Sequence, residues 1–269
     1  MSRYLSIINY RTLITLALSL LVPVVAYQFR VVYNIDLTLM SIAIIFPLVF
    51  TIRGAFRRRE KALEHLSLFR AALKTIENLI QFSPKISDED KIEGQEKIDN
   101  LNNALYNHLT TPIEDPKEFD DAYEGFLNYV RAKSETISGG TREKVFRFLK
   151  DVLDSADNLI AIHSHRTPIS LKAYCLIFIY IFPVIYTPTI INKIGIDNPS
   201  WLTFFIVILS EFILISLYNI QDQMEHPFDD DGLDDIKLKL FSTKRKLFPI
   251  SVSLLYLVGI CEVRELTIY

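Results

Sequence analysis

The stretch Met40–Lys61, M-S-I-A-I-I-F-P-L-V-F-T-I-R-G-A-F-R-R-R-E-K, decides the architecture of this chain. Residues 37–52 carry no charge, and the residues that follow are strongly basic. The basic positions are Arg53, Arg57, Arg58, Arg59 and Lys61. An apolar helix that becomes basic at one end is typical of a membrane span that reaches the cytoplasmic surface.

One face of this apolar helix carries three large side chains. Ile42, Phe46 and Phe50 follow one another at intervals of four residues, so they stack along one side of a helix. Such a face either lines a pore or packs against the next helix. The spacing alone leaves both interpretations open.

The composition narrows the class of protein. The chain has 269 residues, of which 50% are hydrophobic, and its formal net charge is -3. A nucleic-acid-binding protein is usually basic, so we expect no nucleic-acid partner. The two cysteines, Cys175 and Cys261, lie in separate apolar blocks and imply no disulfide framework.

Four uncharged or nearly uncharged blocks are long enough to cross a bilayer or come close to it. They cover residues 12–29, 37–52, 173–192 and 201–220. Trp201 stands at the start of the last block, where an interfacial aromatic residue belongs. A further apolar run, residues 247–261, is marginal in length; we expect a tail packed on a neighbouring subunit, with a short membrane segment as the alternative.

Between the second and third blocks the chain is charged and helical in period. We expect helices over residues 61–81 and 116–136, a loop and a helix start over 83–100, and a short helix over 101–109. Thr141 is expected to cap the next helix, in which Val145, Phe148 and Val152 are spaced helically. The pattern predicts that this region folds as an all-α unit, which we call the helical body.

The division into parts follows from these blocks. We assign residues 1–53 to a first helix pair, 54–165 to the helical body, 166–222 to a second pair, and 223–269 to an acidic turn and tail. Because basic residues collect beyond the second span, both termini and the body are expected to be cytoplasmic, in a multi-pass protein of the cell membrane.

Three charged positions are candidates for attracting ions. Glu211 lies inside the fourth span, where a carboxylate is costly unless it is neutral or paired. It either belongs to an ion pathway or is a protonated carboxyl hydrogen-bonded between helices. Arg53 and the run Arg57 to Arg59, which includes Arg58, would draw anions if they face a pore.

An acidic turn follows the fourth span. Gln223, Asp231 and Asp234 are among many oxygen-bearing side chains within thirteen residues, which is a plausible Ca²⁺ environment. A solvated acidic loop is the simpler interpretation. The sequence contains no phosphate-binding loop, metalloprotease motif or nucleophile turn, so we expect no enzyme and no certain cofactor.

Three segments resemble the bestrophin family of pentameric ion channels. They are F-T-I-R-G-A-F-R-R at residues 50–58, R-T-P-I at 166–169, and H-P-F-D-D-D-G-L-D-D-I at 226–236. Their order around two pairs of spans is similar to the family's. The resemblance is to a divergent, bacterial-type member, because His226 and Asp229 replace the family's asparagine and glycine.

The resemblance implies a four-span, all-α homopentamer, in which the chain's partners are four copies of itself, the lipid bilayer and small ions. Ile42, Phe46 and Phe50 match the family's hydrophobic neck. A second narrow point, the lower aperture, falls near Val145. Gln223, Asp231 and Asp234 match the positions of the family's Ca²⁺ clasp, and the two replacements in this turn put Ca²⁺ gating in doubt.

The function implied is passive conduction of small ions, with chloride favoured. A cation-selective channel for Na⁺ or K⁺ is the first alternative. A non-conducting membrane scaffold, whose helical body docks a partner, is the second.

Overall fold

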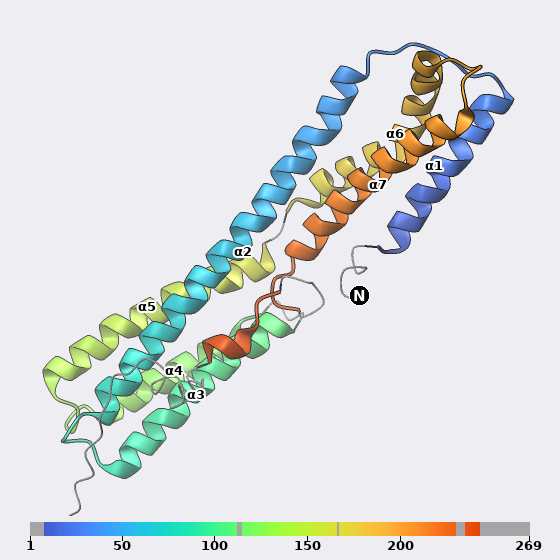
Figure 1. The fold of residues 1–269 in the computed structure, drawn as a ribbon. Coiled ribbons are helices and arrows are strands. Elements are labelled where there is room, and N and C mark those ends of the chain that lie inside the picture. The colour runs from blue at the N-terminus through green and yellow to red at the C-terminus, as the bar shows by residue number, and fades with distance from the viewer. Residues whose placement is uncertain (1–7, 112–114, 166, 230–234, 243–269) are drawn as a thin grey trace, which may run out of the picture.

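The computed structural model describes residues 8–111, 115–165, 167–229 and 235–242, and these form helices and connections with no strand. The elements shown in Figure 1 follow the chain in order. They are α1 (Tyr10–Gln28), α2 (Leu37–Gln81), α3 (Asp88–Thr110), α4 (Lys117–Ala132), α5 (Gly139–Ser164), α6 (Ile169–Ile194), α7 (Ser200–Met224) and the 3₁₀ turn η2 (Leu238–Phe241).

Four stretches of the described chain are long and apolar enough to cross a membrane. They lie in α1, in α2, in the segment that contains α6, and in α7. The predicted all-α architecture with four spans is therefore confirmed. Ile44 and Leu48 of α2 form a small core with Ile179 of α6 and Ile215 of α7.

Helices α1 and α7 run antiparallel along the membrane part. Asn9 and Asn219 hydrogen-bond through their side chains at one end, at 3.0 Å. At the other end, the hydroxyls of Tyr27 and Thr203 are hydrogen-bonded to each other at 2.8 Å. These two contacts fix the register between the first and last spans.

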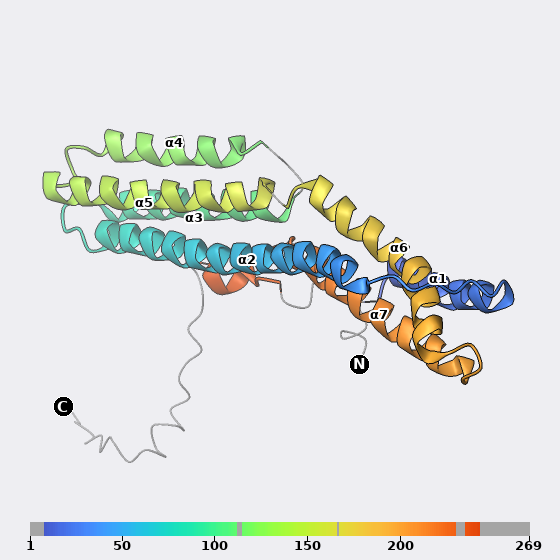
Figure 2. The same cartoon turned by 90° about the horizontal axis from the view of Figure 1, so that it is seen from above.

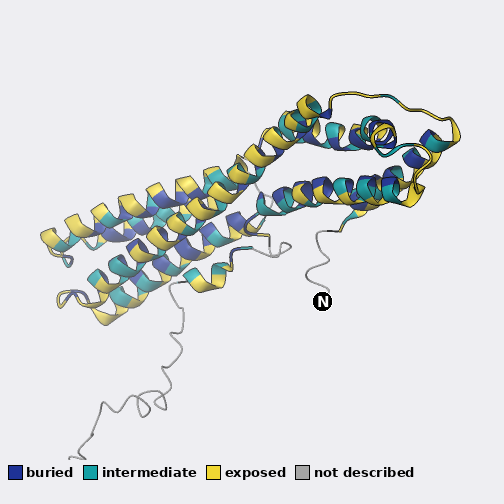
Figure 3. Cartoon of the chain, turned by 45° about the horizontal axis from the view of Figure 1, so that its top comes forward, coloured by how far each residue is buried: buried dark blue, intermediate teal, exposed yellow. Residues whose placement is uncertain are grey.

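A four-helix body occupies the other end of the molecule. The far half of α2 packs with α3, α4 and α5, as Figures 1 and 2 show. Phe69, Phe119 and Phe126 are fully buried in its core. Figure 3 shows the buried residues on the inward sides of these helices and the exposed ones outside, which is the pattern of an amphipathic bundle.

The long helix α2 belongs to both parts. Its 45 residues would span about 68 Å at a rise of ~1.5 Å per residue. The predicted boundary between residues 53 and 54 therefore lies inside one unbroken helix. The change from apolar to basic marks a change of environment and not an end of secondary structure.

Two predictions about the body's helices were wrong in detail. The predicted loop and helix start within residues 83–100 are confirmed, because Ser87 caps α3 after a turn. The predicted separate short helix over 101–109 does not occur, since these residues continue α3. Three acidic residues in its first turn favour a helix N-terminus and stabilise this polar start. The cap of α5 is Ser138, whose hydroxyl accepts a hydrogen bond from the backbone N–H of Thr141.

Helix α1 ends in a turn that normally contains glycine. Arg30 has a φ of 52°, in the left-handed region. The N–H of Arg30 donates to the carbonyl of Tyr27 at 3.3 Å, and that of Val31 donates to Ala26 at 2.9 Å. This pair of bonds is the Schellman arrangement, and it places an arginine where a side chain is strained.

Candidate functional site

The three residues predicted to form the neck lie on the exposed side of α2. Ile42 is 47% exposed, Phe46 57% and Phe50 61% in the single subunit. The rings of Phe46 and Phe50 are neighbours, with centroids 6.0 Å apart. The opposite side of the helix carries the buried Ile44 and Leu48. The structure thus leaves about half of each of these three large apolar side chains exposed.

Pro47 interrupts the hydrogen bonds of α2 at the level of this face. A proline lacks the N–H that would bond to the carbonyl four residues earlier, which here belongs to Ala43. The hydroxyl of Tyr174, on α6, donates to that carbonyl at 3.3 Å. A side chain from the neighbouring helix thus replaces the missing backbone bond.

The arginines that follow the apolar stretch of α2 have different environments. Arg53 is exposed. Arg58 is half-buried, and its guanidinium donates to the hydroxyl of Thr167 at 2.6 Å and lies 3.5 Å from the carboxylate of Glu225. Arg58 is therefore directed toward Thr167 and Glu225, and these contacts give no support to its predicted role in attracting ions at a pore.

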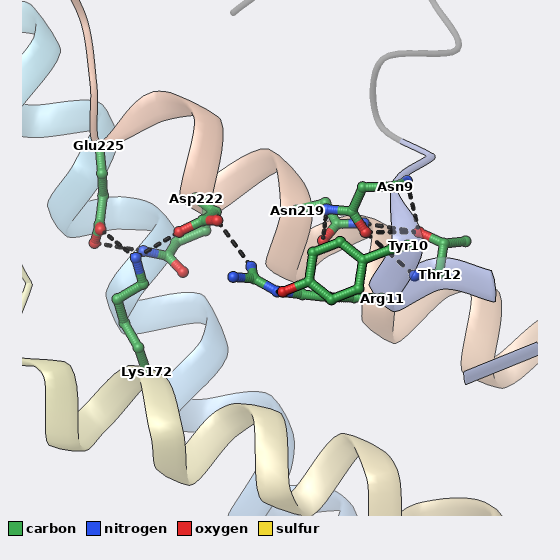
Figure 4. Close-up of polar contacts among 9 residues, drawn as sticks. Asn9, Tyr10, Arg11, Thr12, Lys172, Asn219, Asp222 and Glu225 are labelled. Carbon is green, nitrogen blue, oxygen red and sulfur yellow. Dashed lines mark hydrogen bonds and ion pairs between the residues drawn. The ribbon is translucent and has the colours of Figure 1, made fainter. Parts of the chain in front are cut away.

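A network of charges joins the ends of α1, α6 and α7 (Figure 4). The ammonium of Lys172 donates to Asp222 at 2.5 Å and to Glu225 at 2.8 Å. Arg11 donates to the second oxygen of Asp222 at 2.8 Å. Gln221 donates to Glu225 at 2.5 Å. The network holds the buried Glu225 where the last span meets the acidic turn.

This network bears on the predicted Ca²⁺ clasp. Asp231 and Asp234 lie outside the described residues, and Gln223 lies in the last turn of α7. Within the described residues no group of three histidine, cysteine or acidic side chains is arranged to hold a metal ion. The nearby carboxylates of Asp222 and Glu225 already bind the ammonium of Lys172.

Glu211 is fully buried in the described structure. It lies on α7 between Thr203 and Asn219, the two residues that join this helix to α1. Neither of its carboxylate oxygens has a hydrogen-bond partner among the described residues. This position fits a carboxyl enclosed between helices. The hydrogen bond expected for such a carboxyl is absent among the described residues. Glu211 belongs to α7 and is therefore separate from the exposed face of α2 that carries Ile42, Phe46 and Phe50.

Val145, the residue predicted near the lower aperture, lies inside the helical body. Its side chain is fully buried in the core of the helical body, with Leu149 and Val152 on the same side of α5. A residue that lines an opening must expose its side chain to that opening. The burial of Val145 gives no support to its predicted role at an aperture, because the side chain fills the interior of the described body.

Comparison with solved structures identifies the fold. A bacterial bestrophin homologue from Klebsiella pneumoniae superimposes with a TM-score of 0.71 at 13% sequence identity, covering 86% of this chain and 93% of the homologue. A single-substitution variant of that homologue gives 0.69 at 14% identity. The chain has the bestrophin fold. The resemblance drawn from the three sequence segments is thereby confirmed at the level of fold.

The bestrophin fold is preserved here at very low sequence identity. No protein-family model matches the sequence, and neither does any curated protein. A third structure, described as a membrane protein, matches with a TM-score of 0.68 at 14% identity over 86% of this chain. The helices and their order are therefore shared, whereas the side chains of any site must be judged in this chain alone.

Proposed function

We propose that this chain forms a homopentameric ion channel that conducts small ions passively across the membrane, with chloride the favoured ion. The observation that carries this proposal is the exposed face of Ile42, Phe46 and Phe50 on α2. The bestrophin fold supports it, since the sequence resembles that family of pentameric channels in three segments. In this proposal both termini and the helical body are cytoplasmic, which is supported by the basic residues that follow the second span.

A ring of five copies explains why these residues are exposed in one subunit. Three apolar side chains from each of five subunits would encircle the axis as three rings. A narrow hydrophobic constriction of this kind gates by dewetting, because water leaves a narrow apolar passage and ions cannot cross without water. Widening of the neck would then allow conduction.

The test is ion flux from liposomes containing the purified protein. The triple variant Ile42→Ala, Phe46→Ala, Phe50→Ala should pass chloride faster than the wild type, because it removes most of the apolar volume from the constriction. A matched control is Ile177→Ala on α6, which is also an exposed apolar residue of a span. It should leave the flux unchanged. Equal flux from the triple variant and the wild type would refute the assignment of the neck.

The oligomer mass in detergent tests the assembly. A pentamer is expected. A monomer or dimer that passes no ions would favour the non-conducting scaffold instead. Reversal potentials under a salt gradient decide between an anion channel and the cation-selective alternative.

A further inference from the structure

The exposed face of α2 continues beyond the neck into its basic segment. At about 100° per residue, Arg53 and Arg57 lie within about 20° of the direction of Phe46 around the helix, whereas Arg58 lies about 120° away. Burial agrees with this geometry, because Arg53 and Arg57 are exposed and Arg58 is half-buried. The two arginines therefore extend the line of the neck residues toward the helical body.

These two guanidinium groups differ from that of Arg58 in their partners. Arg58 is bound to Thr167 and lies beside Glu225. Neither Arg53 nor Arg57 has a hydrogen bond or ion pair with any other residue that the structure describes. A positive charge in this position is not neutralised within its subunit.

We propose that Arg53 and Arg57 form an anion-binding ring at the inner mouth of the neck and determine the sign of the ions that pass. The inference rests on the proposed function, because it requires five copies of α2 around one axis. Ten guanidinium groups would then line a short section of the passage. Their ligands are small inorganic anions such as chloride, for which rings of arginine are a known kind of selectivity element.

Acidic residues on the same face oppose the effect of this ring on a passing anion. The distance of each charge from Phe50, the last residue of the neck, decides which sign dominates there. Along the helix axis, Arg53 lies about 4.5 Å from Phe50 and Arg57 about 10 Å, whereas Glu60 and Glu64 lie about 15 Å and 21 Å away. The Debye length at physiological salt is about 8 Å. The arginines therefore act on an ion at the neck within about one screening length, and the glutamates are largely screened.

Lys61 further weakens the acidic pair. Its ammonium lies 3.9 Å from the carboxylate of Glu64, with both side chains mostly exposed. An exposed pair of this kind is weak in energy, but it places a positive charge beside a negative one. The acidic layer is thus partly neutralised, whereas the arginine layer is not.

The experiment measures reversal potentials of the reconstituted protein across a KCl gradient. For the double variant Arg53→Gln, Arg57→Gln we expect the chloride-to-potassium permeability ratio to fall roughly tenfold, because ten charges close to the passage act together. The double variant Glu60→Gln, Glu64→Gln should change the ratio by no more than about twofold. Arg59→Gln, which removes a charge about 140° from the direction of Phe46, is the matched control and should leave the ratio unchanged.

The outcomes separate this inference from the proposed function. If the wild type passes no ions, the proposed function fails, and the inference fails with it. If the wild type passes ions but the ratio is unchanged in the double variant Arg53→Gln, Arg57→Gln, the channel stands and the arginine ring is refuted. A wild type that prefers potassium and loses that preference on removal of Glu60 and Glu64 would also refute it. The oligomer mass of each variant confirms that it still assembles.

Discussion

The ion network beneath the spans allows a quantitative test of how the membrane helices are held together. Lys172 binds two carboxylates, Asp222 and Glu225, and Glu225 is only 1% exposed. In Lys172→Met, Asp222 keeps Arg11, but Glu225 keeps only Gln221 and a guanidinium at 3.5 Å. The variant therefore leaves a buried carboxylate poorly compensated.

Removal of one partner from a buried ion pair costs about 3–5 kcal/mol. We lower this to about 2–3 kcal/mol, because Lys172 is partly exposed and Glu225 retains some compensation. For a chain of this size each kcal/mol corresponds to roughly 2–4 °C in Tm, so Lys172→Met should unfold roughly 4–12 °C below the wild type. Thermal loss of helical circular dichroism in detergent measures this shift.

A second substitution tests the explanation. Glu225→Gln introduced into Lys172→Met removes the uncompensated charge and should restore about 1–2 kcal/mol of stability. The matched control is Lys150→Met, which breaks the exposed pair with Asp154 at 2.7 Å and should cost no more than about 0.5 kcal/mol. If Lys172→Met unfolds at the same temperature as Lys150→Met, the network does not stabilise the fold as described.

Three further predictions concern stability. Arg30→Gly should raise the free energy of unfolding by about 1 kcal/mol, because glycine adopts the left-handed conformation without strain, and thermal unfolding would show a higher Tm. Gly94→Ala should lower that free energy by about 1–2 kcal/mol in a urea titration, because its Cβ would lie 2.7 Å from the hydroxyl of the buried Tyr129. The ammonium of Lys133 and the hydroxyl of Ser87 hold the pKa of Asp90 below its ordinary value of 3.8. The Tm difference between the wild type and Lys133→Met should therefore shrink as the pH falls through and below that value, because Asp90 becomes protonated.

Each of these has a control or a contrary outcome. Gly125→Ala is matched to Gly94→Ala, since nothing lies within 4 Å of its added Cβ, and it should stabilise the chain by about 0.5–1 kcal/mol. A lower Tm for Arg30→Gly would show that the arginine side chain contributes more than its backbone strain costs. A Tm difference for Lys133→Met that is constant from neutral pH to pH 3 would exclude the ion pair with Asp90 as its cause.

Much of the membrane part could be predicted from sequence, because apolar runs and helical period report directly on burial in lipid or protein. The same period also bears on two of the predicted site positions. Val145 repeats with Leu149 and Val152 as core residues do, and Arg57, not Arg58, follows Phe46 and Phe50 around the helix.

Other features depend on contacts between distant parts of the chain. Lys172 and Asp222 are fifty residues apart, so no local pattern indicates that they pair. Helix α3 begins in a polar stretch with little apolar period, and only the acidic first turn beginning at Asp88 and the cap at Ser87 signal it. The side chains of a site in a bestrophin fold therefore need the three-dimensional arrangement to be assigned.

The bond from Tyr174 to the carbonyl of Ala43 has a mechanical consequence. The proline inside α2, Pro47, is the position where this helix bends most easily, and it lies between Phe46 and Phe50 of the proposed neck. Tyr174 of α6 restricts this bend, because its hydroxyl is hydrogen-bonded to the Ala43 carbonyl that Pro47 leaves without a backbone partner. The bend of α2 at Pro47 is thus coupled to the position of α6, a helix outside the proposed neck.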